Sequence, residues 1–189
     1  MTLERQIDYR MVRQCAPTLA ARKVGSLFCI DTGDSQNPVC TVLARWNRDL
    51  NPSGVVARVI AERCCRTFVY VYREEALQGL FAQADVRHFL RNYGYSRFDT
   101  MHALEYMTQR IERCHCFPHE VGLFLGYPLE DVKGFIENGG KNSKYTGYWK
   151  VYGDVCASKK CFECYRKCVM VMSTLFEKGY SLPMLAVAC

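Results

Sequence analysis

The chain of 189 residues contains 49% hydrophobic and 23% charged residues, which is typical of a globular protein and excludes a disordered one. That length suits a single core, so we expect one domain over residues 1–189. The formal net charge of +6 is modest and the basic residues are scattered along the chain, so charge alone gives little support to nucleic-acid binding.

The N-terminal segment does not have the pattern of a secretory signal, because charged residues occur throughout it and no apolar run follows. No window contains the roughly 18 to 20 uncharged residues that a membrane helix requires. These features predict a cytoplasmic protein that does not enter a membrane. In a reducing compartment, most of the twelve cysteines are expected to be buried thiols, with metal ligation or reactivity as the alternatives.

Apolar residues at helical spacing predict a first helix that begins near Leu3 and breaks near Cys15 and Pro17. Pro17 suits the first turn of a second helix over Thr18–Phe28, because its missing N–H would be unpaired there anyway. Cys15 would then precede a helix start, where the dipole and the nearby Lys23 would lower its thiol pKa.

The next part of the chain predicts a β-hairpin between helices. The polar run 31–37 is expected to be a loop, and Pro38 then opens a helix that extends to residue 50. Residues 55–61 and 67–72 are β-branched and aromatic runs, which predict an antiparallel hairpin. Residues 74–113 return to a helical pattern.

The segment Phe117–Asp154 is dense in residues that carry chemistry. It predicts a helix over Leu129–Glu137 and a third strand over Tyr145–Tyr152, and one long helix is expected to follow over Cys156–Lys178. Helices before, between and after a small antiparallel sheet, made of the hairpin plus one strand, predict the α+β class in a single domain.

A candidate proton-transfer pair lies at the start of this segment. Pro118 predicts that His119 and Glu120 occupy the first turn of a helix, where exposed amides and the helix dipole favour a neutral imidazole and an anion. A neutral imidazole beside a carboxylate is equipped for proton transfer. If Cys15 is the nucleophile, His119 would be its base and the protein would be a thiol enzyme. Alternatively, Glu120 complements the dipole, His119 packs locally and Cys15 is a buried thiol.

Two further stretches could contact a ligand. The glycine loop over 138–144 could hold a phosphate on its backbone amides, although it lacks the Walker pattern and a surface turn is the alternative. In the following strand, alternation would place Tyr148, Lys150 and Tyr152 on one face and Trp149 on the other. The polar face would line a pocket, unless these aromatic residues fill the core.

Two helices around a turn at Gly126–Pro128 resemble a helix-turn-helix, which raises DNA binding as an alternative. The second helix, however, carries Glu130, Asp131 and Glu137 against a single Lys133. Since an acidic helix suits a phosphate-lined groove poorly, nucleic-acid binding is not expected.

The cysteine pattern gives weak support for a metal site. One helix stripe holds Cys161, Cys164 and Cys168, and a second group holds Cys114, His115, Cys116 and His119. The stripe extends along about 10 Å of helix, which is too spread for one ion. Buried reduced thiols fit equally well, so no metal ligand is assigned.

Four motifs are spread along the chain: CAPTLA at 15–20, PHEVGLFLGYP at 118–128, GYWKVYGD at 147–154 and YRKC at 165–168. They resemble an uncharacterised family, a domain of unknown function in small cytosolic proteins from anaerobic bacteria. The resemblance brings no activity with it, but it implies a loose association with flavodoxins and iron-limited metabolism. The signature positions that it implies are Cys15, Lys23, His119, Glu120, Tyr148, Lys150, Asp154, Lys167 and Cys168.

Together these observations predict a polar pocket where Cys15, His119 and Lys150 meet, which would bind a small anionic ligand or support thiol or acid–base chemistry. Glu120 would orient His119. The expected ligand contacts are Lys23, Tyr148, Lys150, Asp154 and Lys167. The alternative is a non-enzymatic accessory protein that docks a redox partner such as a flavodoxin, since a basic protein suits an acidic partner.

Overall fold

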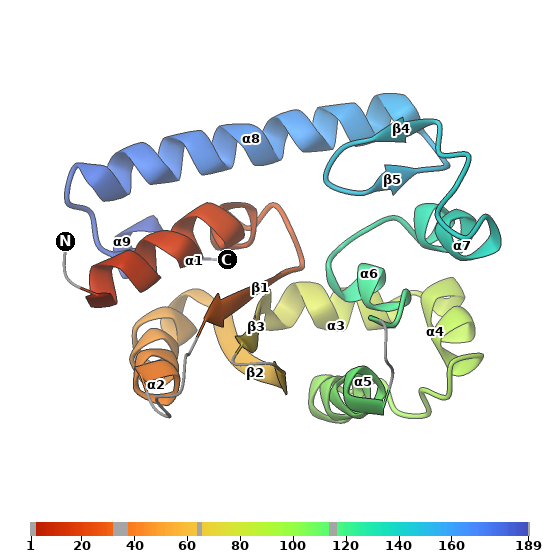
Figure 1. Cartoon of the computed structure of the whole chain (residues 1–189), viewed down its shortest axis with the longest axis horizontal. Coiled ribbons are helices and arrows are strands. Elements are labelled where there is room, and N and C mark those ends of the chain that lie inside the picture. The colour runs from red at the N-terminus through yellow and green to blue at the C-terminus, as the bar shows by residue number, and fades with distance from the viewer. Residues whose placement is uncertain (1–2, 32–37, 64–65, 114–116, 189) are drawn as a thin grey trace.

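The computed structural model describes residues 3–31, 38–63, 66–113 and 117–188, and it has an α+β fold (Figure 1). The first half contains α1 (Leu3–Leu19), β1 (Gly25–Asp31), α2 (Pro38–Leu50), the short 3-10 helix η1 (Asn51–Ser53), β2 (Val55–Arg63) and β3 (Arg66–Arg73). The second half contains α3 (Glu74–Ala82), α4 (Ala84–Arg91), α5 (Thr100–Arg113), α6 (Val121–Phe124), α7 (Leu129–Glu137), β4 (Tyr145–Thr146), β5 (Lys150–Val151), α8 (Val155–Glu177) and α9 (Leu182–Leu185).

The main sheet has the order β1-β3-β2, and both neighbours of β3 run antiparallel to it. Its central strand is buried on both faces, because alternate residues enter two different cores. Val69 and Val71 pack with residues of α1, α2 and α9, whereas Tyr70 and Tyr72 pack with residues of α3 to α7. The predicted hairpin of β2 and β3 is therefore confirmed, as are the helices α2 and α7.

The predicted helix over Thr18–Phe28 is wrong. The first helix continues through Cys15 and Pro17 and ends at Leu19, so Pro17 lies in its last turn instead of opening a new helix. The chain then turns into β1, which pairs with β3 along its whole length. Pairing with the exposed edge of a sheet decides the conformation of such a segment more strongly than its local pattern does. The loop expected over 31–37 lies almost entirely outside the described residues.

The predicted third strand over Tyr145–Tyr152 is also wrong as a single strand of the main sheet. It forms a separate ribbon, in which β4 pairs antiparallel with β5 (Figure 1). The chain reverses at Gly147, whose N–H donates to the carbonyl of Trp149. A Cβ at Gly147 would collide with the ring of Phe162, so a close approach to α8 requires glycine there.

One buried carboxylate fixes this ribbon to α7. Asp131 is 2% exposed and accepts three hydrogen bonds, from Trp149 Nε1 at 2.6 Å and from the backbone N–H groups of Tyr152 at 2.7 Å and Gly153 at 2.8 Å. A buried carboxylate is stable only when donors surround it in this way. Asp131 therefore determines where Trp149 and the ribbon lie relative to α7.

One buried guanidinium holds the other end of the molecule together. Arg73, at the end of β3, donates to the carbonyls of Thr18, Leu19 and Val187 at 2.6 Å each and to that of Ser53 at 3.0 Å. Two of these carbonyls, those of Thr18 and Leu19, belong to the last turn of α1, where they also accept from the N–H groups of Ala21 and Val187. Arg73 thus joins the end of α1, η1 and the C-terminal segment to the sheet.

The long C-terminal helix is confirmed as α8, which lies alongside α1 and begins beside the ribbon (Figure 1). Its N-terminus is capped by Asp154, whose carboxylate accepts from the N–H groups of Cys156 and Ala157 at 2.8 and 3.0 Å. Within the described ranges, no helix is both long enough and apolar enough to cross a membrane.

We predict that Asp131→Asn lowers the free energy of unfolding by about 2–3 kcal/mol, because an amide replaces an acceptor that serves three donors. Urea denaturation would measure the loss. The matched control is Glu130→Gln on the same helix turn, where an exposed carboxylate accepts a long hydrogen bond of 3.4 Å from the N–H of Asp154, and a change below about 0.5 kcal/mol is expected. Equal losses in the two variants would contradict the anchoring role of Asp131.

We predict that Arg73→Met lowers the free energy of unfolding by about 3 kcal/mol or more, since several buried carbonyls lose a charged donor while the aliphatic stem is kept. The control is Arg66→Met on the same strand, where the exposed pair with Asp31 should contribute about 0–1 kcal/mol. Thermal and urea unfolding of both variants would test this difference. An Arg73 variant as stable as the Arg66 variant would refute it.

Candidate functional site

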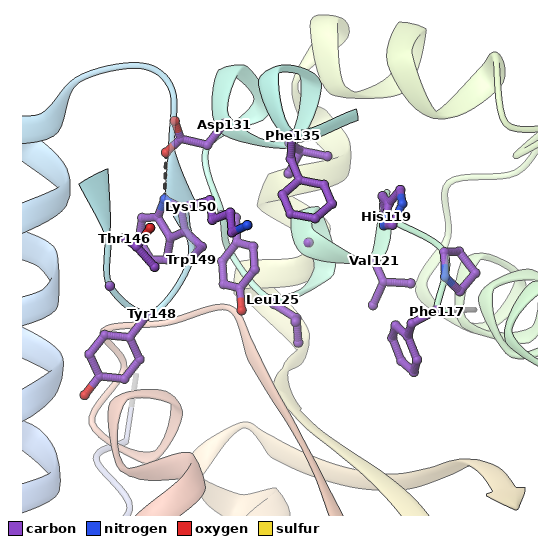
Figure 2. Close-up of a pocket in the computed structure, with 15 residues that line it drawn as sticks. Phe117, His119, Val121, Leu125, Asp131, Phe135, Thr146, Tyr148, Trp149 and Lys150 are labelled. Carbon is purple, nitrogen blue, oxygen red and sulfur yellow. Dashed lines mark hydrogen bonds between the residues drawn. The ribbon is translucent and has the colours of Figure 1, made fainter. Parts of the chain in front are cut away.

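A cavity of about 390 Å³ lies between the segment that leads into α6, the helix α7 and the β4–β5 ribbon (Figure 2). Most of its lining is apolar or aromatic and comes from Phe117, Val121, Leu125, Tyr127, Phe135 and Trp149. We call it the aromatic cavity. Its size and lining are typical of sites for small organic molecules.

Two basic side chains lie on either side of one aromatic ring in this cavity. The ring centroids of His119 and Phe135 are 5.0 Å apart in an edge-on arrangement, and Lys150 Nζ lies 5.9 Å from the same Phe135 centroid (Figure 2). The Lys150 ammonium donates to the carbonyl of Gly140 at 2.6 Å. Within the described part of the chain, no carboxylate lies within 4 Å of His119 or Lys150.

The ribbon positions Lys150 through the alternation that the sequence predicts. Trp149 and Val151 are buried, whereas Tyr148 and Lys150 are exposed. Trp149 stacks on Tyr127, with ring centroids 4.9 Å apart, and forms one wall of the cavity. Tyr148 packs edge-on against Tyr165 of α8 and lines the cavity at the opposite end from His119 (Figure 2). The part of its ring that is covered there is withdrawn from water, which raises the pKa of the Tyr148 hydroxyl.

His119 and Glu120 do not form the expected couple. They occupy a turn that precedes α6, which is itself a single turn of four residues and not the first helix of a helix-turn-helix. Glu120 is 1% exposed and accepts a hydrogen bond from Arg110 Nε of α5. A buried carboxylate takes the strongest donor available, so Glu120 forms a structural ion pair and does not orient His119.

Cys15 lies apart from the aromatic cavity, which it does not line. Because α1 continues past it, Cys15 is not at a helix start and receives no help from an N-terminal dipole. Its side chain is fully buried, and this burial raises the pKa of the Cys15 thiol to about 12. The expected reactive thiolate is therefore replaced by a protonated core thiol.

The remaining candidates divide into three kinds. Lys23 lines a second cavity that shares Tyr127 and Tyr148 with the aromatic cavity. The carboxylate of Asp154 is used to cap α8. Lys167 is exposed on α8 and lines neither cavity. The structure thus brings together His119, Tyr148 and Lys150, with Lys23 next to them.

The glycine loop after α7 serves as a source of carbonyl acceptors. Gly140 accepts from Lys150, and Lys141 accepts from the Tyr152 hydroxyl at 2.9 Å. Gly139 and Gly140 have φ values of 54° and 73°, which suit glycine and allow the chain to leave α7 sharply.

The sequence reasoning missed the aromatic wall, and Phe135 in particular. The signal that could have found it is the spacing of Asp131 and Phe135, which stand at i and i+4 on α7 and therefore share one helix face. Both residues line the aromatic cavity.

The cysteine stripe of α8 is half-buried at Cys161, Cys164 and Cys168. Among the described residues, no group of three or more His, Cys, Asp or Glu side chains is arranged to hold a metal ion. Of the second group of candidate ligands, residues 114–116 lie outside the described residues, and His119 lines the aromatic cavity.

A comparison with curated proteins and a comparison with solved structures each found no match. One family model, described as "Protein of unknown function (DUF3793)", matches residues 11–186. That span includes all of the candidate site residues and agrees with the resemblance that the four sequence motifs indicate. The chain therefore belongs to the DUF3793 family.

Proposed function

We propose that this member of the DUF3793 family is a cytoplasmic protein that binds a small organic anion with a flat apolar body. The observation that carries the proposal is the placement of two basic side chains, His119 and Lys150, on either side of Phe135 in a cavity of about 390 Å³. An aromatic cavity with a few convergent polar groups is the common form of a small-molecule site.

The apolar body of the ligand would lie against the aromatic wall. Tyr127 and Trp149 are stacked at 29° to each other, and Phe135 lies on the α7 side of the same cavity. Flat rings favour offset stacking or edge-to-face contact with a flat ligand, which adds about 0.5–1.5 kcal/mol per pair beyond the area buried.

The anionic group would be held by Lys150 and His119. An ammonium has three donors, and that of Lys150 uses one of them on Gly140. The acid that lines the cavity, Asp131, has both carboxylate oxygens occupied by its three hydrogen bonds. An anion that enters the cavity would therefore meet two basic groups without an opposing free carboxylate.

The proposal is binding and not thiol catalysis, because Cys15 is a buried protonated thiol outside this cavity. Glu120 is held by Arg110, so it does not support His119 as a base. Proton transfer by His119 to or from a bound ligand remains compatible with the site, and it would require the same ligand position.

The test uses 8-anilinonaphthalene-1-sulfonate, a flat aromatic anion whose fluorescence rises in apolar surroundings. We predict saturable one-to-one binding to the native protein. Phe135→Ala should weaken it at least tenfold, because one wall of the cavity is removed. Lys150→Met should weaken it about three- to tenfold through loss of the anion contact. Fluorescence titration measures each dissociation constant.

The matched control is Lys144→Met. Lys144 is another exposed lysine whose ammonium donates to one backbone carbonyl, that of Gly153, but it does not line the cavity. Near-ultraviolet circular dichroism would verify that each variant keeps its tertiary packing. The uncharged analogue N-phenyl-1-naphthylamine should be insensitive to Lys150→Met. Unchanged affinity for the sulfonate in both Phe135→Ala and Lys150→Met would refute the proposal.

A further inference from the structure

A second cavity of about 250 Å³ adjoins the aromatic cavity. Its polar lining comes from Arg13, Gln14, Lys23 and Ser26, on α1, β1 and the turn between them. Tyr127 and Tyr148 line both cavities, so a single ligand could extend from one into the other. We call it the Lys23 cavity.

Lys23 lies in aromatic surroundings, and the titratable groups that act on its charge are the thiols of Cys15 and Cys161. Its ammonium is 5.8 Å from the ring centroid of Tyr127 and 5.8 Å from that of Tyr165. In the described part of the chain, no carboxylate lies within 4 Å of it. Burial lowers the pKa of the Lys23 ammonium.

The charges that line the Lys23 cavity have one sign. Arg13 and Lys23 are both basic, and no acidic side chain lines the cavity with them. The other polar groups there include the Gln14 amide and the Tyr148 hydroxyl, both of which can donate hydrogen bonds. Withdrawing a cation from water without a counter-ion is unfavourable, and an anion in the cavity would remove that penalty.

We propose that the Lys23 cavity binds an oxyanion, a phosphate or carboxylate group, with Lys23 as its main contact and Arg13 as the second cation. This inference rests on the proposed function in one respect, which is that the oxyanion belongs to the ligand whose flat body occupies the aromatic cavity. The ligand class then becomes a flat molecule with two anionic groups, one at Lys150 and one at Lys23.

A purely structural role for Lys23 would predict different behaviour. In that case its ammonium would serve only to cover the rings of Tyr127 and Tyr165. Phosphate would then act through ionic strength and through its general exclusion from protein surfaces, to the same extent with and without Lys23. A binding role predicts that phosphate acts through Lys23 specifically.

The first test is the thermal midpoint of the full-length protein in sodium phosphate, compared with sodium chloride at matched ionic strength. We expect phosphate to raise the midpoint because it binds the folded state. Lys23→Met should weaken the apparent phosphate affinity at least tenfold, whereas Lys23→Arg should retain most of it. Lys160→Met is the control, since Lys160 is exposed on α8 and lines neither cavity. An unchanged phosphate effect in Lys23→Met would overturn the proposal.

A second test does not depend on the stability of a lysine-to-methionine variant. The ¹³Cε resonance of Lys23 in ¹³C-lysine-labelled protein, assigned by its loss in Lys23→Arg, reports the titration of this ammonium. A bound anion favours the charged form, so the pKa of Lys23 should be below the usual lysine range in chloride and should rise in saturating phosphate. A titration of Lys23 that is insensitive to phosphate would refute the inference.

Repeating both tests with acetate in place of phosphate distinguishes a carboxylate site from a phosphate site. The ion that raises the thermal midpoint through Lys23 identifies the class of oxyanion that the cavity binds. The two proposals also fail separately. If phosphate acts through Lys23 but Phe135→Ala does not change the affinity for 8-anilinonaphthalene-1-sulfonate, the anion site is supported and the aromatic site is refuted. If Phe135→Ala weakens sulfonate binding but neither phosphate nor acetate changes the titration of Lys23, the anion site is refuted.

Discussion

The architecture of this protein depends on a buried guanidinium that donates to four backbone carbonyls. Arg73 is the last residue of the central strand, and its guanidinium donates to carbonyls at the end of α1, in η1 and in the C-terminal segment. A helix C-terminus inside a protein needs donors for its free carbonyls, and here the Arg73 side chain supplies them together with the backbone N–H groups of Ala21, Arg22 and Val187. Because Arg73 fixes the point where α1 ends, it also fixes the turn that carries Lys23 toward the rings of Tyr127 and Tyr165.

A buried anion has the corresponding role on the other side of the site. Asp131 gathers three N–H donors from the ribbon, and Glu120 is held by Arg110, so the buried acids near the cavities serve the scaffold. The basic groups that face the cavities, Lys23 and Lys150, then have no carboxylate partner among the described residues. This division between acids that are hydrogen-bonded within the scaffold and cations without a carboxylate partner is the basis on which we propose an anion for both cavities.

The two cavities are physically coupled through shared side chains. Tyr127 stacks on Trp149 in the aromatic cavity and also lies beneath the Lys23 ammonium. Tyr148 lines both cavities and rests on α8 through Tyr165. A ligand that moves either tyrosine would therefore change the shape of both cavities. The DUF3793 family match covers all of these residues, so the arrangement lies within the region that defines the family.

The sequence by itself determined the elements whose pattern is local. The β2–β3 hairpin, α2, α7, α8 and the α+β class follow from periodicity, turn residues and caps. Of the residues expected to meet in one pocket, His119, Tyr148 and Lys150 line the aromatic cavity and Cys15 does not. Only the tertiary structure decided that residues 25–31 form an edge strand, that 145–152 folds into a separate ribbon, that Glu120 pairs with Arg110 and that Cys15 is buried. The physical reason is that periodicity shows which side of a helix or strand is apolar. Strand pairing, ion pairing and burial depend instead on which residues from distant parts of the chain pack against that helix or strand.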